Sequence, residues 1–167
     1  GFDVLGKGNS LISFNTNVVV IMVLSILIII GGLGFTVWSE LYTCKSIRRV
    51  SIHSKMVLLI TTGLVVGGTL LMFLFEHNNP QTISKMSFIN KLTNSFFASV
   101  TPRTAGFNSI STSGMTTAGQ FLTIILMFIG GSPGSTAGGI KTTTIGVLIV
   151  TVVSVIRGRQ DSEVFKR

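Results

Sequence analysis

The sequence is poor in charged residues, and above all in acidic ones. Lys, Arg, Asp and Glu make up 11% of its 167 residues, and only five residues are acidic. Soluble domains average about 25% charged residues. Hydrophobic residues reach 46%, and the mean hydropathy is +0.68. This balance excludes an ordinary soluble domain and predicts an integral membrane protein.

Cysteine and histidine are also scarce. Cys44 is the single cysteine, which excludes an internal disulfide. The two histidines, His53 and His77, fall on opposite sides of the membrane in the topology described below, so they cannot share a metal ion. The acidic residues are mostly scattered near the ends of the apolar runs: Asp3, Glu40, Glu76, Asp161 and Glu163. We therefore predict no catalytic residues, no enzyme activity and no organic cofactor. Glu76 with His77 is typical of a solvated helix end.

The excess of positive charge is informative because of its position. The net charge is +8, and most cations cluster at 45–55 and 157–167, at the ends of apolar runs. Cytoplasmic loops of membrane proteins carry such clusters, whereas nucleic-acid binding needs a basic face that follows the phosphates. The pattern predicts a membrane protein that does not bind nucleic acid.

Two apolar runs are long enough to cross a bilayer as helices. Val18–Trp38 has 21 residues and Met56–Phe75 has 20; about 20 helical residues span the hydrocarbon core. The basic loop 41–55 between them is predicted to be cytoplasmic. The helix over 18–38 then runs inward, and the helix over 56–75 runs outward.

A third apolar segment is too short to cross. As a helix, Leu92–Val100 covers about 14 Å at 1.5 Å per residue. A run of this length is a buried, interfacial or re-entrant segment. Pro102 and Gly106 follow it. We predict that the segment 92–108 enters the membrane and returns to the same side.

The last apolar segment is too long for one straight crossing. Met115–Ile156 would form a helix of about 63 Å. Its middle, 130–139, holds five glycines and one proline. In hydrocarbon, irregular backbone persists only inside protein or beside a water-filled cavity. We predict one inward crossing over 115–157, broken at 130–139 beside a path through the membrane, and a cytoplasmic tail over 158–167.

Two parts of the chain share a pattern. Gly1-Phe2-Asp3 and Gly106-Phe107-Asn108 are similar triplets, and each precedes a polar stretch and an apolar helix that contains a Gly-Gly pair. Internal repeats are a feature of transport proteins. The pattern indicates a repeated unit of helix, re-entrant loop and helix. Residues 56–157 hold one complete unit and 1–40 hold the end of another, as if the chain were cut from something longer.

The segment Thr104–Asn108 has the chemistry of an ion filter. A short helix followed by an extended strand with glycine can aim backbone carbonyls at a dehydrated cation. The C-terminus of the short helix carries partial negative charge, which favours a cation in front of it. Gly106 allows a backbone angle that other residues avoid. The alternative, a plain extracellular turn, stays open on these residues alone.

Lys141 lies too deep to reach the cytoplasmic surface. It is about sixteen residues from that end, or about 24 Å along a helix. An intramembrane lysine costs about 2.5–3.5 kcal/mol on insertion scales, so it should face a cavity or a partner. We predict that Lys141 lines the wet path near the break.

Two glycine motifs resemble nucleotide-binding loops and are rejected. From Gly134 to Thr142 the spacing departs from a P-loop, because Ile140 separates glycine from lysine and no strand precedes the loop. Gly31-Gly32-Leu33-Gly34 lies inside a predicted membrane helix, where close helix packing or a kink is expected.

These segments resemble one superfamily of transporters. The stretch Ser99–Asn108, SVTPRTAGFN, is similar to the third pore loop of the Ktr/Trk/HKT superfamily of potassium transporters. Gly130–Thr144, GGSPGSTAGGIKTTT, closely resembles the broken second helix of the same repeat, with features nearer to the Ktr membrane subunit than to Trk. Gly1-Phe2-Asp3 resembles the end of the second repeat's filter. The resemblance covers essentially the whole chain.

The resemblance implies an all-α membrane protein of M1–pore loop–M2 repeats, as in potassium channels. Four pseudo-symmetric repeats would surround one pore, and this chain would hold about one and a half of them. Each repeat supplies one filter glycine, here Gly1 and Gly106, and the loop 130–139 is an intramembrane gate below the filter. Family members form homodimers and bind a cytosolic ring of nucleotide-binding RCK subunits, and Na+ often stimulates uptake. The remaining repeats would belong to a longer protein.

We predict the pore-forming subunit of a potassium uptake system in a bacterial cell membrane, with K+ as cargo and Na+ as a stimulating ion. The predicted ion ligands are the backbone carbonyls of five filter residues: Gly1, Thr104, Ala105, Gly106 and Phe107. The loop 130–139, called the gate loop below, consists of Gly130, Gly131, Ser132, Pro133, Gly134, Ser135, Thr136, Ala137, Gly138 and Gly139. The alternative is a secondary transporter whose discontinuous helix binds another solute and which needs no re-entrant helix at 92–100.

Overall fold

The computed structural model describes residues 10–44, 50–103 and 105–157. Within them the regular structure is helical, and the one extended pairing is an isolated bridge between Ile129 and Ile140. The helices in chain order are η1 (Ile12–Phe14), α1 (Val18–Leu33), α2 (Phe35–Thr43), α3 (Ile52–Glu76), α4 (Phe88–Val100), η3 (Thr112–Gly114), α5 (Thr117–Phe128) and α6 (Thr142–Ile156). The predicted all-α fold class is confirmed.

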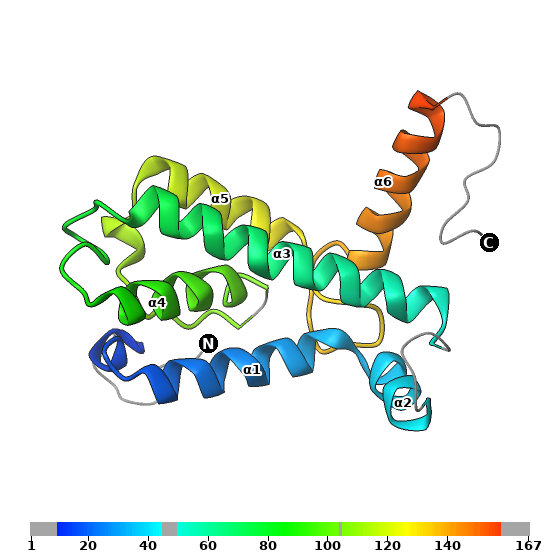
Figure 1. The fold of residues 1–167 in the computed structure, drawn as a ribbon, viewed down its shortest axis with the longest axis horizontal. Coiled ribbons are helices and arrows are strands. Elements are labelled where there is room, and N and C mark those ends of the chain that lie inside the picture. The colour runs from blue at the N-terminus through cyan, green and yellow to red at the C-terminus, as the bar shows by residue number, and fades with distance from the viewer. Residues whose placement is uncertain (1–9, 45–49, 104, 158–167) are drawn as a thin grey trace.

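The helix α3 runs along the length of the molecule and contacts most of the other helices. α4 packs against both α3 and α1, and α5 packs on α3 at the same end of the molecule (Figure 1). At the opposite end α2 and α6 turn away from the bundle in different directions. The non-helical segment between α5 and α6 lies between the far end of α1 and α3.

By length and composition, α3 is the one straight helix among the described residues that qualifies as a membrane span. Its 25 residues correspond to the outward helix predicted over 56–75. α5 and α6, with 12 and 15 residues, are shorter apolar helices on either side of a break. They correspond to the two halves of the broken crossing predicted over 115–157.

The helix predicted over 18–38 is divided into two helices by a sharp bend. α1 ends at Leu33, and α2 continues at an angle of 93°. The bend occurs at Gly34, whose φ of +87° is a left-handed conformation that L-residues rarely adopt. The Trp38 Nε1–H donates to the Ile30 carbonyl oxygen at 2.9 Å across the bend. The kink expected at Gly31–Gly34 is therefore confirmed, and it shortens the crossing to α1.

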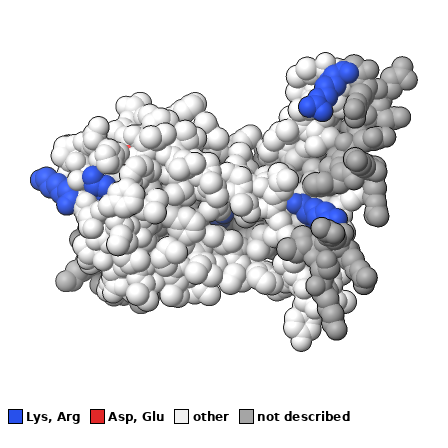
Figure 2. All heavy atoms as spheres, viewed as in Figure 1, with Lys and Arg blue, Asp and Glu red and all other residues white. Residues whose placement is uncertain are grey.

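The surface of the bundle is largely apolar. Several large side chains on three helices are more than half exposed: Val19, Leu70, Leu74, Phe121 and Ile124. Figure 2 shows lysine and arginine side chains at the two ends of the long axis, with almost none between them. An uncharged middle with charged ends fits a molecule whose middle is covered by lipid or by further protein.

Small residues allow α4 to approach α3 closely. A Cβ on Gly68 of α3 would overlap the Ser99 side chain of α4. The Ser99 hydroxyl lies 3.3 Å from the Leu64 carbonyl oxygen and 3.2 Å from that of Val65. This contact satisfies a buried hydroxyl and positions the C-terminal half of α4 against the longest helix of the molecule.

Glu76 is buried, so the prediction of a solvated helix end is wrong. Its side chain is 1% exposed and accepts four hydrogen bonds. The Asn79 amide and Thr82 hydroxyl donate to Oε2 at 2.8 and 2.7 Å, and the Thr116 N–H and hydroxyl donate to Oε1 at 2.8 and 2.7 Å. Thr116 caps the N-terminus of α5, where a carboxylate is favourable. Glu76 therefore ties α5 and the loop after α3 to the end of α3.

Candidate functional site: a re-entrant strand facing a closed loop

The segment after α4 turns back instead of continuing. α4 has 13 residues, about 20 Å as a helix, which is too short to cross a bilayer. At its end the N–H groups of Ala105 and Gly106 donate to the Thr101 carbonyl oxygen at 3.1 and 3.3 Å. The chain then runs back over 105–110, a segment without regular secondary structure that is called the strand below (Figure 1). The predicted filter residues Gly1 and Thr104 lie outside the described residues.

Gly106 stands in the middle of this returning strand in a special conformation. Its φ is +78°, and it is exposed, whereas Ala105 and Phe107 on either side are half-buried. The Thr101 hydroxyl donates to the Phe107 carbonyl oxygen at 2.6 Å, which holds the strand against the end of α4. Sequence reasoning missed Thr101, although a hydroxyl at the end of a pore-type helix is a signal for such a bond.

The strand also contacts the segment that precedes α1. The Asn108 N–H donates to the Ser10 hydroxyl at 3.0 Å, and the Leu11 N–H donates to the Asn108 carbonyl oxygen at 2.9 Å. Ser10 and Leu11 follow the triplet Gly1-Phe2-Asp3, which itself lies outside the described residues. The chain after one predicted filter triplet thus lies beside the end of the other.

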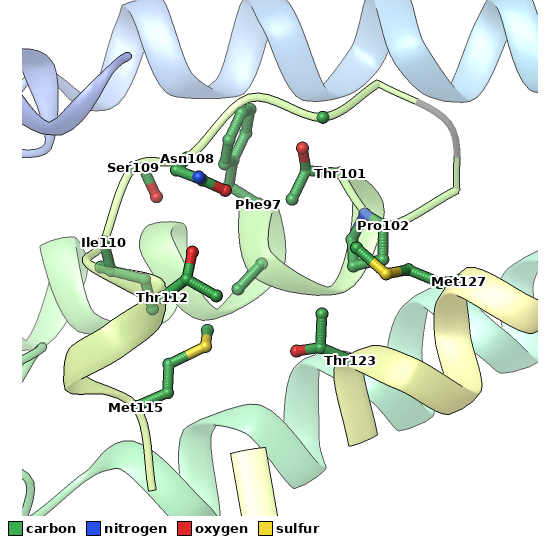
Figure 3. A pocket seen from close by; sticks show the side chains of 12 residues that line it. Phe97, Thr101, Pro102, Asn108, Ser109, Ile110, Thr112, Met115, Thr123 and Met127 are labelled. Atoms are coloured by element: carbon green, nitrogen blue, oxygen red, sulfur yellow. The ribbon is translucent and has the colours of Figure 1, made fainter. Parts of the chain in front are cut away.

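A cavity of about 240 Å³ lies behind the strand, between α4 and α5 (Figure 3). Phe97, Thr101 and Pro102 face it from the end of α4, and Thr123 and Met127 face it from α5. Its lining also includes Gly106. The strand is therefore not packed against α5 along its whole length, and its conformation depends on hydrogen bonds with Thr101 and with the segment Ser10–Leu11.

A second cavity, of about 340 Å³, lies between the strand and the gate loop. Ala105 and Phe107 line it from the strand, and Thr136 and Ala137 line it from the gate loop. Its third wall is α1, through Leu24, Leu27, Ile28, Gly31 and Gly32. The predicted filter and the predicted gate loop thus border one common space.

Arg103 also lines this second cavity, and its side chain is 7% exposed. Sequence reasoning did not select it. A usable signal was present, because Arg103 is the last charged residue before an uncharged stretch that extends to Ile140. A fixed positive charge at this place makes the electrostatic potential in the second cavity more positive.

The gate loop is closed at its base by backbone hydrogen bonds. The Gly130 N–H donates to the Ile140 carbonyl oxygen at 3.0 Å, and the Ile140 N–H donates to that of Phe128 at 3.1 Å. A Cβ on Gly130 would overlap the Gly138 carbonyl oxygen. Glycine at 130 is therefore required for the ends of the loop to meet.

Hydroxyl groups satisfy the loop from within. The hydroxyls of Ser132 and Thr142 are buried and lie 3.0 Å apart, within hydrogen-bond distance. The Ser135 hydroxyl donates to the Ser132 carbonyl oxygen at 2.6 Å. These bonds give irregular backbone the partners that it needs away from water.

Lys141 closes the loop at its end. It stands immediately before α6 and is partly buried. Its ammonium donates to the Ala137 carbonyl oxygen at 2.6 Å, and Ala137 lines the second cavity. The charge is thus held at the edge of the space between strand and loop, while the role of Lys141 in the pore stays a prediction.

The site contains carbonyl groups and no cluster of acidic or metal-ligating side chains. Among the residues that the structure describes, no three His, Cys, Asp or Glu side chains lie close enough to hold a metal ion. The candidate ligands for a cation are therefore the predicted backbone oxygens of the turn at Ala105–Phe107, of which that of Phe107 also accepts from Thr101. Such oxygens suit an alkali cation that passes through.

Comparison with known proteins agrees with this geometry. The family model described as "TrkH: Cation transport protein" matches residues 1–167. The chain belongs to the TrkH family of cation transport proteins. The resemblance inferred from the filter and gate-loop motifs is therefore confirmed.

Curated relatives of this TrkH-family chain are potassium uptake proteins. The chain is 47% identical to the potassium/sodium uptake protein NtpJ of Enterococcus hirae over 167 residues, which is all of this chain and 36% of that protein. It is 37% identical to the Ktr system potassium uptake protein B of Bacillus subtilis over 95% of this chain and 36% of that protein. The chain thus spans about a third of the length of the relatives it matches.

A solved structure has the same fold. The potassium transporter TrkH from Vibrio parahaemolyticus superposes with a TM-score of 0.74 over 93% of this chain and 34% of that one. The sequence identity is 20%, so this likeness concerns the fold.

Proposed function

We propose that this chain is part of the pore-forming subunit of a potassium uptake system in a bacterial cell membrane. One observation carries the proposal: α4 stops short, returns through Gly106, and faces the closed gate loop across a common cavity. A re-entrant helix with a glycine strand is the arrangement of a cation pore, whereas a carrier with a discontinuous helix has no need of it. The family and the names of the relatives support cation uptake.

The proposed filter consists of the carbonyls of Thr104, Ala105, Gly106 and Phe107, together with that of Gly1 from the preceding repeat. Several such strands would replace the hydration shell of K+. The C-terminus of α4 points its partial negative charge at the turn, which favours a cation there. K+ is the proposed cargo. Na+ is a second ion that the system responds to, as the name of the Enterococcus relative suggests.

The proposed gate is the loop 130–139. It interrupts the α5–α6 crossing, borders the cavity below the strand and is held closed by hydrogen bonds at its base. Ions pass when this loop moves aside. Its many glycines lower the barrier to an alternative backbone conformation.

The proposed partners follow from the exposed apolar surface and from the family. The remaining repeats of the same transporter complete the pore, a second copy forms a homodimer, and a cytosolic RCK-type nucleotide-binding subunit regulates it. Lipid covers the remaining exposed apolar surface. In the proposed orientation the basic loop 41–55 and the tail 158–167 face the cytoplasm. The protein catalyses no reaction and binds neither an organic cofactor nor nucleic acid.

The experiment that tests this proposal is ion flux from the full-length transporter reconstituted in liposomes. Uptake of 86Rb+ should be inhibited by external K+ far more strongly than by Na+ at the same concentration. Uptake that is indifferent to K+, or that follows an organic solute instead, would favour a secondary transporter for another solute.

A further inference from the structure

The glycine motif Gly31-Gly32-Leu33-Gly34 has no role in the filter or in the gate loop itself, yet it contacts the gate loop directly. It forms the break between α1 and α2, and Gly34 takes the positive φ that allows the 93° bend. The motif lies about 100 residues before the gate loop in the sequence. Two backbone hydrogen bonds join them.

Both hydrogen bonds use groups that a helix break leaves without partners. The Ser132 N–H donates to the Gly32 carbonyl oxygen at 3.0 Å, and the Phe35 N–H donates to the Gly134 carbonyl oxygen at 3.1 Å. The Gly32 carbonyl is one of the last carbonyls of α1, and the Phe35 N–H is the first N–H of α2. In a membrane such groups need protein partners, and here the gate loop supplies them.

Close approach at Gly34 is possible because it lacks a side chain. A Cβ there would lie 2.5 Å from the Pro133 carbonyl oxygen and 3.4 Å from the Gly134 carbonyl carbon. On the loop side, a Cβ on Gly131 would lie 3.1 Å from the Gly32 carbonyl oxygen. At both positions a glycine therefore lies directly against backbone carbonyl groups of the other segment.

We propose that the α1–α2 break holds the gate loop in its closed position and that Gly34 is a positioning residue for transport. The inference rests on the proposed function of the loop as gate. Opening requires the bonds from Ser132 to Gly32 and from Phe35 to Gly134 to break. A change in the direction of α2 moves the Phe35 N–H and so releases the loop.

The test is Gly34→Ala in the full-length transporter, reconstituted in liposomes and assayed by 86Rb+ uptake. The added Cβ displaces the Pro133 carbonyl oxygen, and alanine is strained at the left-handed φ of this position. The loss of one hydrogen bond, about 1 kcal/mol, should raise flux about fivefold. The Rb+ over Na+ preference should stay unchanged because the filter is untouched. Gly63→Ala is the matched control, since a Cβ on this α3 glycine meets nothing within 4 Å. A purely structural role for Gly34 would lower flux instead, and flux equal to the control or below it overturns the proposal.

A deletion of Ser132–Gly138 separates this inference from the function on which it rests. If the loop is a gate, the deletion raises flux, and Gly34→Ala adds nothing in the deleted background. If the deletion raises flux but Gly34→Ala does not, the gate stands and the positioning role of Gly34 fails. If the deletion does not raise flux, the gate function itself fails.

A second variant addresses the case in which Gly34→Ala does not fold. A Cβ on Gly31 would lie 3.7 Å from the Thr136 hydroxyl oxygen, so cysteine side chains at these two positions would be neighbours. Gly31→Cys with Thr136→Cys, in a protein whose other cysteines are replaced by serine, should lose flux on oxidation and regain it on reduction. Each single cysteine variant should be indifferent to the oxidant. Full flux in the crosslinked protein would show that the loop does not leave α1 during transport.

Discussion

At the scale of single residues, the site depends on glycines that take positive φ angles. Gly34, Gly106, Gly134 and Gly139 all do so among the described residues, and three of them lie in the α1–α2 break or the gate loop. For an L-residue the left-handed conformation costs roughly 1–2 kcal/mol. The sequence showed that glycines gather at 31–34 and 130–139. The φ angles then separated those that turn the chain from those that only make room for a neighbour.

Gly106→Ser in the full-length transporter should weaken the discrimination of K+ from Na+. Serine resists the φ of +78°, so the carbonyls of the strand turn away from their common axis. The measurement is inhibition of 86Rb+ uptake by K+ and by Na+ in liposomes. Gly67→Ala, at an α3 glycine with nothing within 4 Å of the added Cβ, is the control. An unchanged selectivity ratio would exclude Gly106 from the filter.

Thr101→Val should have a similar but smaller effect. The substitution removes the 2.6 Å bond to the Phe107 carbonyl oxygen at nearly constant volume, a loss of about 1 kcal/mol. Because a cavity lies behind the strand, it is held mainly by this bond and by the bonds of Asn108 with Ser10 and Leu11. Thr101→Ser keeps the hydroxyl and should keep the selectivity of the wild type. Equal selectivity in the valine and serine variants would contradict this role.

At the scale of helices and loops, breaks matter more than spans. The length of apolar runs placed α3 correctly and indicated that 115–156 is interrupted, because a helix of that length cannot fit the bilayer. At α1–α2 the run of 21 residues forms two helices at an angle of 93°, which pass the length and composition test for a span only as a pair. A helix bends sharply when terminal backbone groups find other partners, and here those partners come from the distant gate loop.

Deleting Ser132–Gly138 should raise the flux of the full-length transporter. The deletion removes seven of the ten loop residues and leaves in place the groups that bond at the base of the loop, the Gly130 N–H to the Ile140 carbonyl oxygen and the Ile140 N–H to that of Phe128. The assay is the same 86Rb+ uptake, compared with wild-type protein at equal amounts in the liposomes. Flux that stays equal or falls would show that the loop is structural.

Glu76→Gln should destabilise the protein without a change in ion selectivity. In glutamine one of the two carboxylate oxygens is replaced by an NH2 group, which cannot accept the hydrogen bonds that this oxygen now accepts. Hydrogen bonds to a charged group are worth about 1.5–3 kcal/mol each. The expected result is a lower thermal unfolding midpoint in detergent. Glu40→Gln is the matched control, because Glu40 is only partly buried whereas Glu76 is 1% exposed. Similar midpoints for the two variants would contradict the role of Glu76 as the tie between α3 and α5.

At the scale of the whole molecule, the described chain has a face that is too apolar for water. Large side chains on α1, α3 and α5 are more than half exposed, and charge gathers at the two ends (Figure 2). The chain spans 36% of the Enterococcus relative, which agrees with a piece that other parts of a transporter cover.

The proposed orientation can be tested with thiol labelling in cells. Cys44, at the end of α2, should react with a membrane-impermeant maleimide only after permeabilisation, because it borders the basic loop 41–55. Lys85→Cys, exposed in the loop before α4 at the opposite end, should react in intact cells. Cysteines outside this chain are replaced by serine. Labelling of Cys44 in intact cells would show that the topology is the reverse of the proposed one.

The sequence by itself determined the membrane class and the helical fold, and it located the short helix before Gly106 and the glycine-rich break at 130–139. These features depend on local composition and on lengths that the bilayer sets, so they can be read along the chain. The family resemblance rested on two short motifs in the same segments.

Only the tertiary structure decided which residues far apart in the sequence come together. It placed the gate loop on the α1–α2 break, brought Arg103 into the cavity between strand and loop, and buried Glu76 under Thr116. Each of these contacts joins positions separated by more than 25 residues. Their formation depends on how the helices pack around α3, and no periodicity along the chain carries that information.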